Sequence, residues 1–358
     1  MRPTRLEVNI GNFKYNVEQI KKYTNKEIMP VIKANAYGTY INKRMEVIKE
    51  FDIVAVAMVS EGAELRKKGY EGNIFILNQP SISEIDDIIK HNLTVGISDI
   101  SFLNECIKKD ASFKVHLEIE TGMNRTGIQI EDLNRFLDTN IKSSLKIEGI
   151  YTHLSSADTD PEYTSKQISL FQDALDICRS RGINFKYIHV NASNGLLNYP
   201  LDFTNLVRPG LLLYGYESYK DCSKKIPLKP VCRLISEVTF VKRVQEEARI
   251  GYNGSFICDI DSSIATVPIG YADGIRRELS NKGYVYINSR KAPIVGKICM
   301  DSFMIDVTGI RVNVGDEVVI FDEEHIKLDE VAELCNTISY EILSTISNRV
   351  PRVFIEKK

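Results

Sequence analysis

The stretch DIVAVAMVSEGAELRKKGYEGNIFILNQPSISEIDDIIKHNLTVGI (52–97) contains three short apolar runs separated by two more polar segments. The runs are DIVAVAM (52–58), NIFIL (73–77) and LTVGI (93–97). Such nearly continuous apolar runs are typical of parallel strands that are buried on both faces. The intervening segments, 60–69 and 82–90, have the apolar spacing of amphipathic helices. The alternation predicts parallel strands joined by helical crossovers.

The same alternation extends in both directions from this stretch. Further amphipathic segments lie at 99–109 and 163–181. Further apolar runs lie at 6–10, 29–33, 113–120, 145–153, 186–190 and 206–215. About eight strand–helix units in about 220 residues favour a (β/α)8 barrel over an open doubly wound sheet. Periodicity alone does not exclude the open sheet.

The composition changes at ESYKDCSKKIPLKP (217–230), a polar segment with two prolines that is typical of a linker. Beyond it the pattern becomes strands and turns, followed by a helix at 326–336 and a last strand, RVFIE (352–356). The predicted strands lie at 234–244, 263–272, 283–298, 302–310 and 316–321. We therefore predict a barrel domain over 1–225 and a mostly β domain over 226–358.

Charge and cysteine content narrow the class of protein. The 46 basic and 48 acidic side chains nearly cancel, so nothing indicates a nucleic acid or an anionic membrane as partner. The seven cysteines show no metal-binding spacing and are expected to be free thiols, and no metal site is predicted. The start of the chain lacks the apolar run of a signal peptide, and no apolar run reaches about 18 residues. We expect a cytoplasmic globular protein with a small-molecule partner.

Polar residues follow several of the apolar runs, where the active site of a parallel barrel gathers. Lys33 ends the run MPVIK (29–33). Burial at a strand end lowers the pKa of a lysine, which suits a Schiff-base nucleophile. The structural alternative is a lysine whose amine simply reaches solvent.

Similar candidates follow the other runs. They are Glu118, Glu120, Arg125, His153, His189, Ser193, Arg208 and Gly210. Each alone has a structural explanation, such as a hydrogen-bonded core histidine, but together they indicate a small-molecule site. The loops NASNG (191–195) and PGLL (209–212) expose backbone N–H groups suited to phosphate. In the second domain, Tyr271 lies in PIGYADG (268–274). A tyrosine there can act as an acid or base, and the structural alternative is an aromatic residue packed at a domain interface.

Eight motifs then occur in an order that matches one family. They are VIKANAYG (31–38), TGMNRTG (121–127), THLSSAD (152–158), LVRPGLLLYG (206–215), GYADGIRRELSN (270–281), APIVGKICMD (292–301), ISYEI (338–342) and RVPR (349–352). The chain resembles the alanine racemases, fold-type III enzymes that use pyridoxal phosphate (PLP). The resemblance runs nearly end to end. It implies an N-terminal barrel, a C-terminal β domain and a homodimer with shared active sites.

The resemblance also implies the role of each matching residue. Lys33 would hold PLP and move a proton on one face of the substrate, and Tyr271 of the partner subunit would serve the other face. His153 would pack against the cofactor ring, and Arg125 would contact the ring hydroxyl and the substrate carboxylate. Phosphate would be bound by Tyr37, Ser193 and the backbone at Gly210 and Leu211. Met300 and Asp301 would complete the substrate pocket from the partner subunit.

Arg208 matches the arginine that faces the pyridine nitrogen of the cofactor. A guanidinium has a pKa above about 12 and does not give up its proton, so the ring nitrogen stays unprotonated. Delocalisation of charge into the ring is then limited, which disfavours transamination and decarboxylation. Arg208 therefore favours a racemase over the related decarboxylases, which place a carboxylate there.

Three positions depart from the family pattern. Glu118 stands where many members carry a carbamylated lysine, and we predict that it orients Arg125 through a charge-assisted hydrogen bond. Asn348 stands where a tyrosine usually borders the substrate and the phosphate. Asparagine leaves room for a hydroxymethyl group and offers a donor and an acceptor. Tyr40 replaces a glycine, and whether it narrows the pocket or only packs stays open.

The serine/alanine racemases associated with vancomycin resistance are similar to this chain at Asn348 and at GLLNYP (195–200). The leading prediction is a PLP-dependent racemase of alanine and serine that supplies D-amino acids for cell-wall precursors. The alternatives are a dedicated serine or broad-specificity racemase, a fold-type III decarboxylase, and a non-catalytic PLP carrier. Such carriers are single barrels, so the second domain argues against the last.

Overall fold

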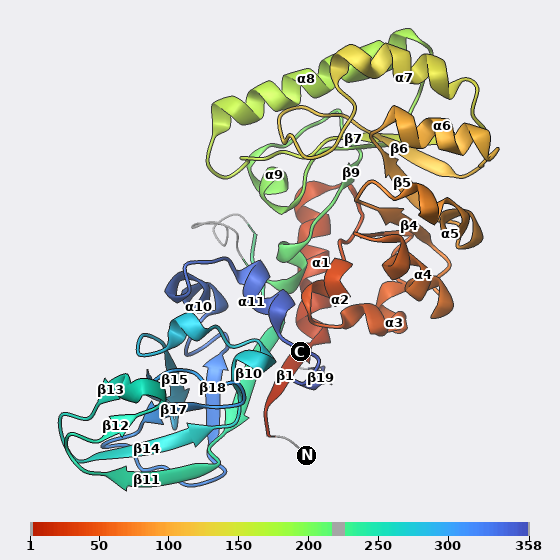
Figure 1. The fold of residues 1–358 in the computed structure, drawn as a ribbon. Helices are drawn as coiled ribbons and strands as arrows, with labels where there is room; N and C mark the ends of the chain where they lie inside the picture. Colours follow the sequence, from red (N-terminus) through yellow and green to blue (C-terminus); the bar gives the residue numbers. More distant parts are fainter. Residues whose placement is uncertain (1–2, 217–225, 357–358) are drawn as a thin grey trace.

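The computed structural model describes residues 3–216 and 226–356 (Figure 1). Two parts lie side by side, a helix-covered barrel and a smaller part made mostly of strands. Residues 217–225 of the predicted linker (217–230), including Cys222, lie outside the described residues. The cysteines that the structure describes are free thiols.

The first part contains a parallel sheet of six strands in the order β3-β4-β5-β6-β7-β8 and a parallel pair, β2 and β9. Isolated bridges between Val31 and Ala55 and between Ala192 and Arg208 connect the two sheets at both edges. Within the described residues, eight parallel strands therefore form a closed ring, which confirms the predicted barrel. The strands are β2 (Glu27–Ile28), β3 (Ile53–Val56), β4 (Asn73–Ile76), β5 (Thr94–Ile97), β6 (Lys114–Glu118), β7 (Lys146–Tyr151), β8 (Tyr187–His189) and β9 (Leu206–Val207).

Helices cover the outside of this ring, so strands such as β3 and β5 are buried along their whole length. Helix starts follow local sequence signals: Asp99 caps α6 by accepting from the backbone N–H groups of Ser101 and Phe102. The helices of this part are α1 (Ile10–Thr24), α2 (Lys33–Tyr37), α3 (Met45–Ile48), α4 (Val59–Lys67), α5 (Ile85–Lys90), α6 (Ile100–Lys108), α7 (Leu133–Asn140), α8 (Pro161–Ser180) and α9 (Ser193–Asn198). None of the helices in the described part of the chain is long and apolar enough to cross a membrane.

The second part is built on a sheet in the order β11-β14-β17-β16-β15-β18-β10-β1-β19, with a separate β12–β13 pair. This arrangement confirms the predicted mostly β region. The strands are β10 (Cys232–Glu237), β11 (Phe240–Val244), β12 (Arg249–Ile250), β13 (Phe256–Ile257), β14 (Ser262–Val267), β15 (Tyr284–Ile287), β16 (Arg290–Val295), β17 (Phe303–Asp306), β18 (Glu317–Phe321) and β19 (Arg352–Ile355).

The apolar run predicted as the first barrel strand lies in this second sheet instead. Strand β1 (Arg5–Asn9) pairs antiparallel with β10 and parallel with β19. Its side chains alternate between buried and partly exposed, as in a sheet with one covered face, whereas barrel strands such as β3 and β5 are buried along their whole length. The chain therefore begins in the β part and enters the barrel through α1.

Two helices near the C-terminus connect the two parts. Helix α10 (Leu328–Leu334) corresponds to the predicted helix at 326–336, but α11 (Ser339–Thr345) was not predicted. Helix α11 packs against α2, and a Cβ added to Gly38 would lie 2.3 Å from the Leu343 carbonyl oxygen. This contact brings residues of the C-terminal part to the mouth of the barrel.

Candidate functional site

A cavity of about 570 Å³ opens at the carboxyl ends of the barrel strands. This volume is in the range of small-molecule and cofactor sites. Most of the predicted site residues from the barrel line it. They are Lys33, Tyr37, Glu118, Arg125, His153, Ser193, Arg208 and Gly210.

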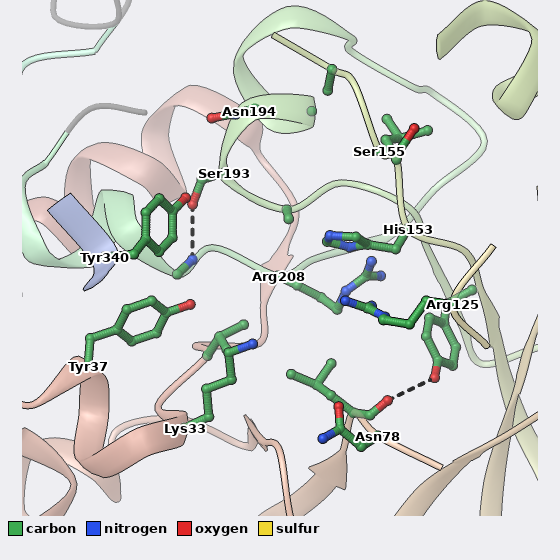
Figure 2. Close-up of a pocket in the computed structure, with 18 of the residues that line it drawn as sticks. Lys33, Tyr37, Asn78, Arg125, His153, Ser155, Ser193, Asn194, Arg208 and Tyr340 are labelled. Atoms are coloured by element: carbon green, nitrogen blue, oxygen red, sulfur yellow. Dashed lines mark hydrogen bonds between the residues drawn. The ribbon is translucent and has the colours of Figure 1, made fainter. Parts of the chain in front are cut away.

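Lys33 enters the cavity from the start of α2 (Figure 2). Burial, and then the charge of Arg125, lower the pKa of the Lys33 amine, while Glu61 opposes this shift. A lowered pKa raises the share of the neutral, nucleophilic amine at neutral pH. Glu61 also binds the backbone behind the lysine, because its carboxylate accepts from the N–H of Ala34 at 2.6 Å.

One end of the cavity is a small polar cradle. Figure 2 shows Tyr37, Ser193 and Tyr340 on one side of Lys33. The N–H of Gly210 donates to Ser193 Oγ at 3.1 Å, and a Cβ added to Gly210 would lie 2.4 Å from the Tyr37 hydroxyl. Because position 210 is a glycine, the space beside the Tyr37 and Ser193 hydroxyl groups stays free of a side chain. Burial raises the pKa of Tyr37, so its hydroxyl stays neutral and able to donate.

Arg208 lies at the other end of the cavity and is almost completely buried. Its guanidinium donates to His189 Nδ1 at 2.6 Å and to the carbonyl oxygens of His189, Thr152 and Val190. Burial is the main cause that lowers the pKa of Arg208 to about 10, so it remains charged at neutral pH.

A chain of two histidines extends from Arg208 into the barrel. His189 Nε2 lies 2.8 Å from His116 Nδ1. Burial, followed by the charge of Arg208, lowers the pKa of both imidazoles, so both are neutral. Because an arginine only donates, His189 accepts at Nδ1 and carries its proton on Nε2, directed at His116. Sequence reasoning noted His189 at a strand end but did not find this connection.

Glu118 is buried beside Arg208 and Arg125, but its hydrogen bond differs from the predicted one. Among the described residues, the carboxylate accepts from Thr126 Oγ1 at 2.9 Å rather than from Arg125. Burial raises the pKa of Glu118, and Thr126, Tyr151 and the two arginine charges oppose this shift. The predicted direct hydrogen bond between Glu118 and Arg125 is therefore not present. The hydrogen bond comes from Thr126, the next residue along the chain, and Arg125 acts on Glu118 through its charge.

Some cavity residues were missed. Asn78 follows β4, where the rule of polar strand ends would have found it. Tyr340 comes from the motif ISYEI, which carried the family resemblance without a role. The ring of Tyr340 lies 5.8 Å from that of Tyr37.

The remaining predicted site residues do not line the cavity of their own chain. Tyr271 and Met300 are exposed on the C-terminal part, at 44% and 51%, and Asp301 is exposed beside them. The segments around Tyr271 and Met300 are joined by a backbone hydrogen bond, which the N–H of Tyr271 donates to the Cys299 carbonyl oxygen at 3.0 Å. Asn348 is also exposed. Leu211, next to Gly210, is fully buried and does not line the cavity.

Comparison with known proteins agrees with this arrangement over both parts. Sequence models of the alanine racemase N-terminal and C-terminal domains match residues 8–218 and 231–354. Alanine racemase 2 of Caldanaerobacter subterraneus is 36% identical over 370 residues, covering 99% of this chain and 95% of that protein. Alanine racemase 1 of Clostridium acetobutylicum is also 36% identical, covering 99% and 96%. The solved alanine racemase from Bacillus anthracis with bound L-Ala-P is 32% identical, with a TM-score of 0.94 over 100% of this chain and 96% of that one.

A closed barrel with a lysine in its mouth, followed by a β domain, defines the class of two-domain PLP enzymes. The chain belongs to the alanine racemase family, whose members are PLP-dependent isomerases. The residues present fit this cofactor. A lysine of lowered pKa stands between a cradle of hydroxyl and N–H groups, suited to phosphate, and a buried arginine that fits a ring nitrogen.

Proposed function

We propose that the protein interconverts L- and D-alanine and also L- and D-serine, and that its D-alanine serves cell-wall precursor synthesis. The observation that carries the racemase proposal is the position of Lys33, a cavity lysine of lowered pKa between the Tyr37–Ser193–Gly210 cradle and Arg208. When bound, PLP supplies the electron sink that makes the substrate Cα–H acidic.

The chain's own residues divide the remaining work. Tyr37 and Ser193, with the N–H of Gly210, bind phosphate, and Lys33 moves the proton on one face of Cα. Racemisation needs a second group on the opposite face, and we assign it to Tyr271 of the partner subunit. The exposure of Tyr271 and Met300 outside their own cavity supports a site shared between two copies of the chain.

Arg208 favours racemisation over decarboxylation. Its bonds to His189 and to three carbonyl oxygens fix it in place, and because its pKa stays well above neutral, the guanidinium keeps its proton at neutral pH. Since the ring nitrogen would face a permanent donor, it would accept a hydrogen bond and stay unprotonated. The carrier alternative lacks support, because the C-terminal domain model matches as well.

The serine activity is tested directly on the purified protein with PLP. We would incubate it separately with L-alanine and L-serine and follow each D-enantiomer by chiral chromatography. Formation of both D-products supports the proposal, and faster D-serine formation would indicate a dedicated serine racemase. Formation of D-alanine alone would refute the serine activity. The absence of both D-products would refute the racemase proposal.

A further inference from the structure

Two of the positions that depart from the family pattern meet in space. The Tyr40 hydroxyl donates to the side-chain oxygen of Asn348, although the two residues are 308 positions apart. Tyr40 follows α2, and Asn348 follows α11. The contact therefore joins the segment that carries the cofactor lysine to the C-terminal part of the chain.

The Tyr40 ring is held by more than this hydrogen bond. Lys43 Nζ lies 4.1 Å, and Arg352 Cζ 4.7 Å, from the ring centroid. Arg352 in turn donates to the carbonyl oxygens of Gly38, Ser347, Ile346 and Val350. Because these carbonyls belong to both segments, the ring occupies a defined place between them.

The two segments that carry Tyr40 and Asn348 also line the cavity. Tyr37, three residues before Tyr40, and Ser344, four residues before Asn348, both line it. On the other side, Arg349 Nη2 lies 2.5 Å from a carboxylate oxygen of Asp301. The segments that carry the pair thus contact the cavity through Tyr37 and Ser344 and, through Arg349, the loop predicted to complete a partner's substrate pocket.

We propose that Tyr40 and Asn348 form one specificity-determining pair, in which Tyr40 is a positioning residue that acts through Asn348. With the side-chain oxygen of Asn348 engaged by the hydroxyl, the amide nitrogen is the group left to donate to a hydroxymethyl side chain. Because the Tyr40 hydroxyl contacts the end of the Asn348 side chain, a longer tyrosine side chain in the same orientation at 348 would collide with it. This inference rests on the proposed racemase function and makes its side-chain specificity depend on two residues together.

The test is a cycle of Asn348→Tyr, Tyr40→Gly and the double variant, prepared as holoenzymes. Glycine suits position 40 because Tyr40 has φ +62°, in the left-handed region. Asn348→Tyr alone should lower kcat/KM about tenfold for both substrates, and the double variant should regain alanine kcat/KM to within about threefold of wild type while serine stays low. The dissociation constant of PLP, measured by fluorescence on the same four proteins, should show the same non-additivity.

A milder variant separates positioning from folding. Tyr40→Phe keeps the ring and removes only the hydroxyl, so the serine-to-alanine ratio of kcat/KM should fall about threefold or more with little change in melting temperature. The matched control is Tyr70→Phe, which removes a hydroxyl that donates to the Phe51 carbonyl away from the cavity. That control should leave the ratio at its wild-type value.

The proposal that the two residues act together would be overturned if their effects were additive both on kcat/KM and on the dissociation constant of PLP. It would also be overturned if Tyr40→Phe had the same serine-to-alanine ratio of kcat/KM as the Tyr70→Phe control. If the wild type forms no D-serine, the dual-substrate proposal fails by itself. The alanine cycle and the PLP cycle then still decide whether the two residues act together.

Discussion

Among the residues of the cavity wall, Glu118 is the one that departs most clearly from the family pattern, because it stands where many members carry a carbamylated lysine. Its carboxylate is buried in the cavity wall and interacts with Thr126 and with the charges of Arg125 and Arg208. An anion at this place offsets the charge of the buried Arg208 and that of the exposed Arg125, which a neutral side chain of the same shape does not do.

Glu118→Gln should therefore lower kcat about tenfold or more with a smaller effect on melting temperature. Because burial raises the pKa of Glu118 above its ordinary value, wild-type turnover should fall as the pH drops through that raised pKa and the anion is lost. The glutamine variant should lack this acidic limb in its pH profile. Glu120→Gln is the matched control, two residues away and also buried; equal losses in both variants, or wild-type turnover in Glu118→Gln, would contradict the assignment.

Sequence reasoning found the residues that end barrel strands, because a parallel barrel gathers strand ends whatever their exact packing. It found Lys33, Arg125, His153 and Arg208 in this way. It did not find Tyr340 or the contact of Tyr40 with Asn348. Those depend on α11 docking at the barrel mouth, which is a long-range contact that no local pattern contains.

At the scale of elements, the segment after Lys33 has an unusual backbone. Ala34, Asn35, Ala36 and Tyr37 all have φ between +52° and +55°, and Gly38 has φ +76°. Left-handed helical geometry costs about 1–2 kcal/mol for each non-glycine residue, so the surrounding contacts must impose it. The sequence KANAY (33–37) gave no sign of this, since alanine favours an ordinary right-handed helix. By contrast, the placement of β1 in the second sheet was readable in principle from its alternating pattern.

Gly38→Ala should lower the free energy of unfolding by more than the positive φ of Gly38 alone explains. The added Cβ would meet the Leu343 carbonyl oxygen at 2.3 Å, and backbone atoms give way poorly. Gly182→Ala is a matched control, because Gly182 has φ +74° with nothing within 4 Å of an added Cβ. We expect the control to cost about 1 kcal/mol and Gly38→Ala to cost about 2 kcal/mol more, together with weaker PLP binding. Chemical denaturation and PLP titration measure both, and equal losses in the two variants would show that α11 does not hold the segment.

At the scale of the whole molecule, the buried histidines make stability depend on pH. Burial lowers the pKa of His116 to about 3, below its value of about 6.5 in an unfolded chain. The unfolded state therefore binds more protons between these values, and stability is lost as the pH falls from about 6.5 towards 3. His116→Asn, which keeps a polar partner for His189, should make this loss shallower by about 2 kcal/mol at pH 5. A dependence of stability on pH that is the same in His116→Asn as in wild type would contradict the prediction.

The proposed sharing of active sites between two copies of the chain can be tested by mixing inactive variants. Lys33→Ala removes a residue that lines the cavity, and Tyr271→Phe changes one that lies outside the cavity of its own chain. If Tyr271 completes the partner's cavity, a mixed dimer holds one intact site and one doubly damaged site. Unfolding and refolding the two variants together should then restore about a quarter of wild-type activity, since about half of the dimers are mixed and each has one working site. Lys33→Ala mixed with Arg125→Ala is the control: both residues line the same cavity, so no intact site can form. Activity in neither mixture would place Tyr271 outside a shared site and return the second proton transfer to a group within the cavity itself.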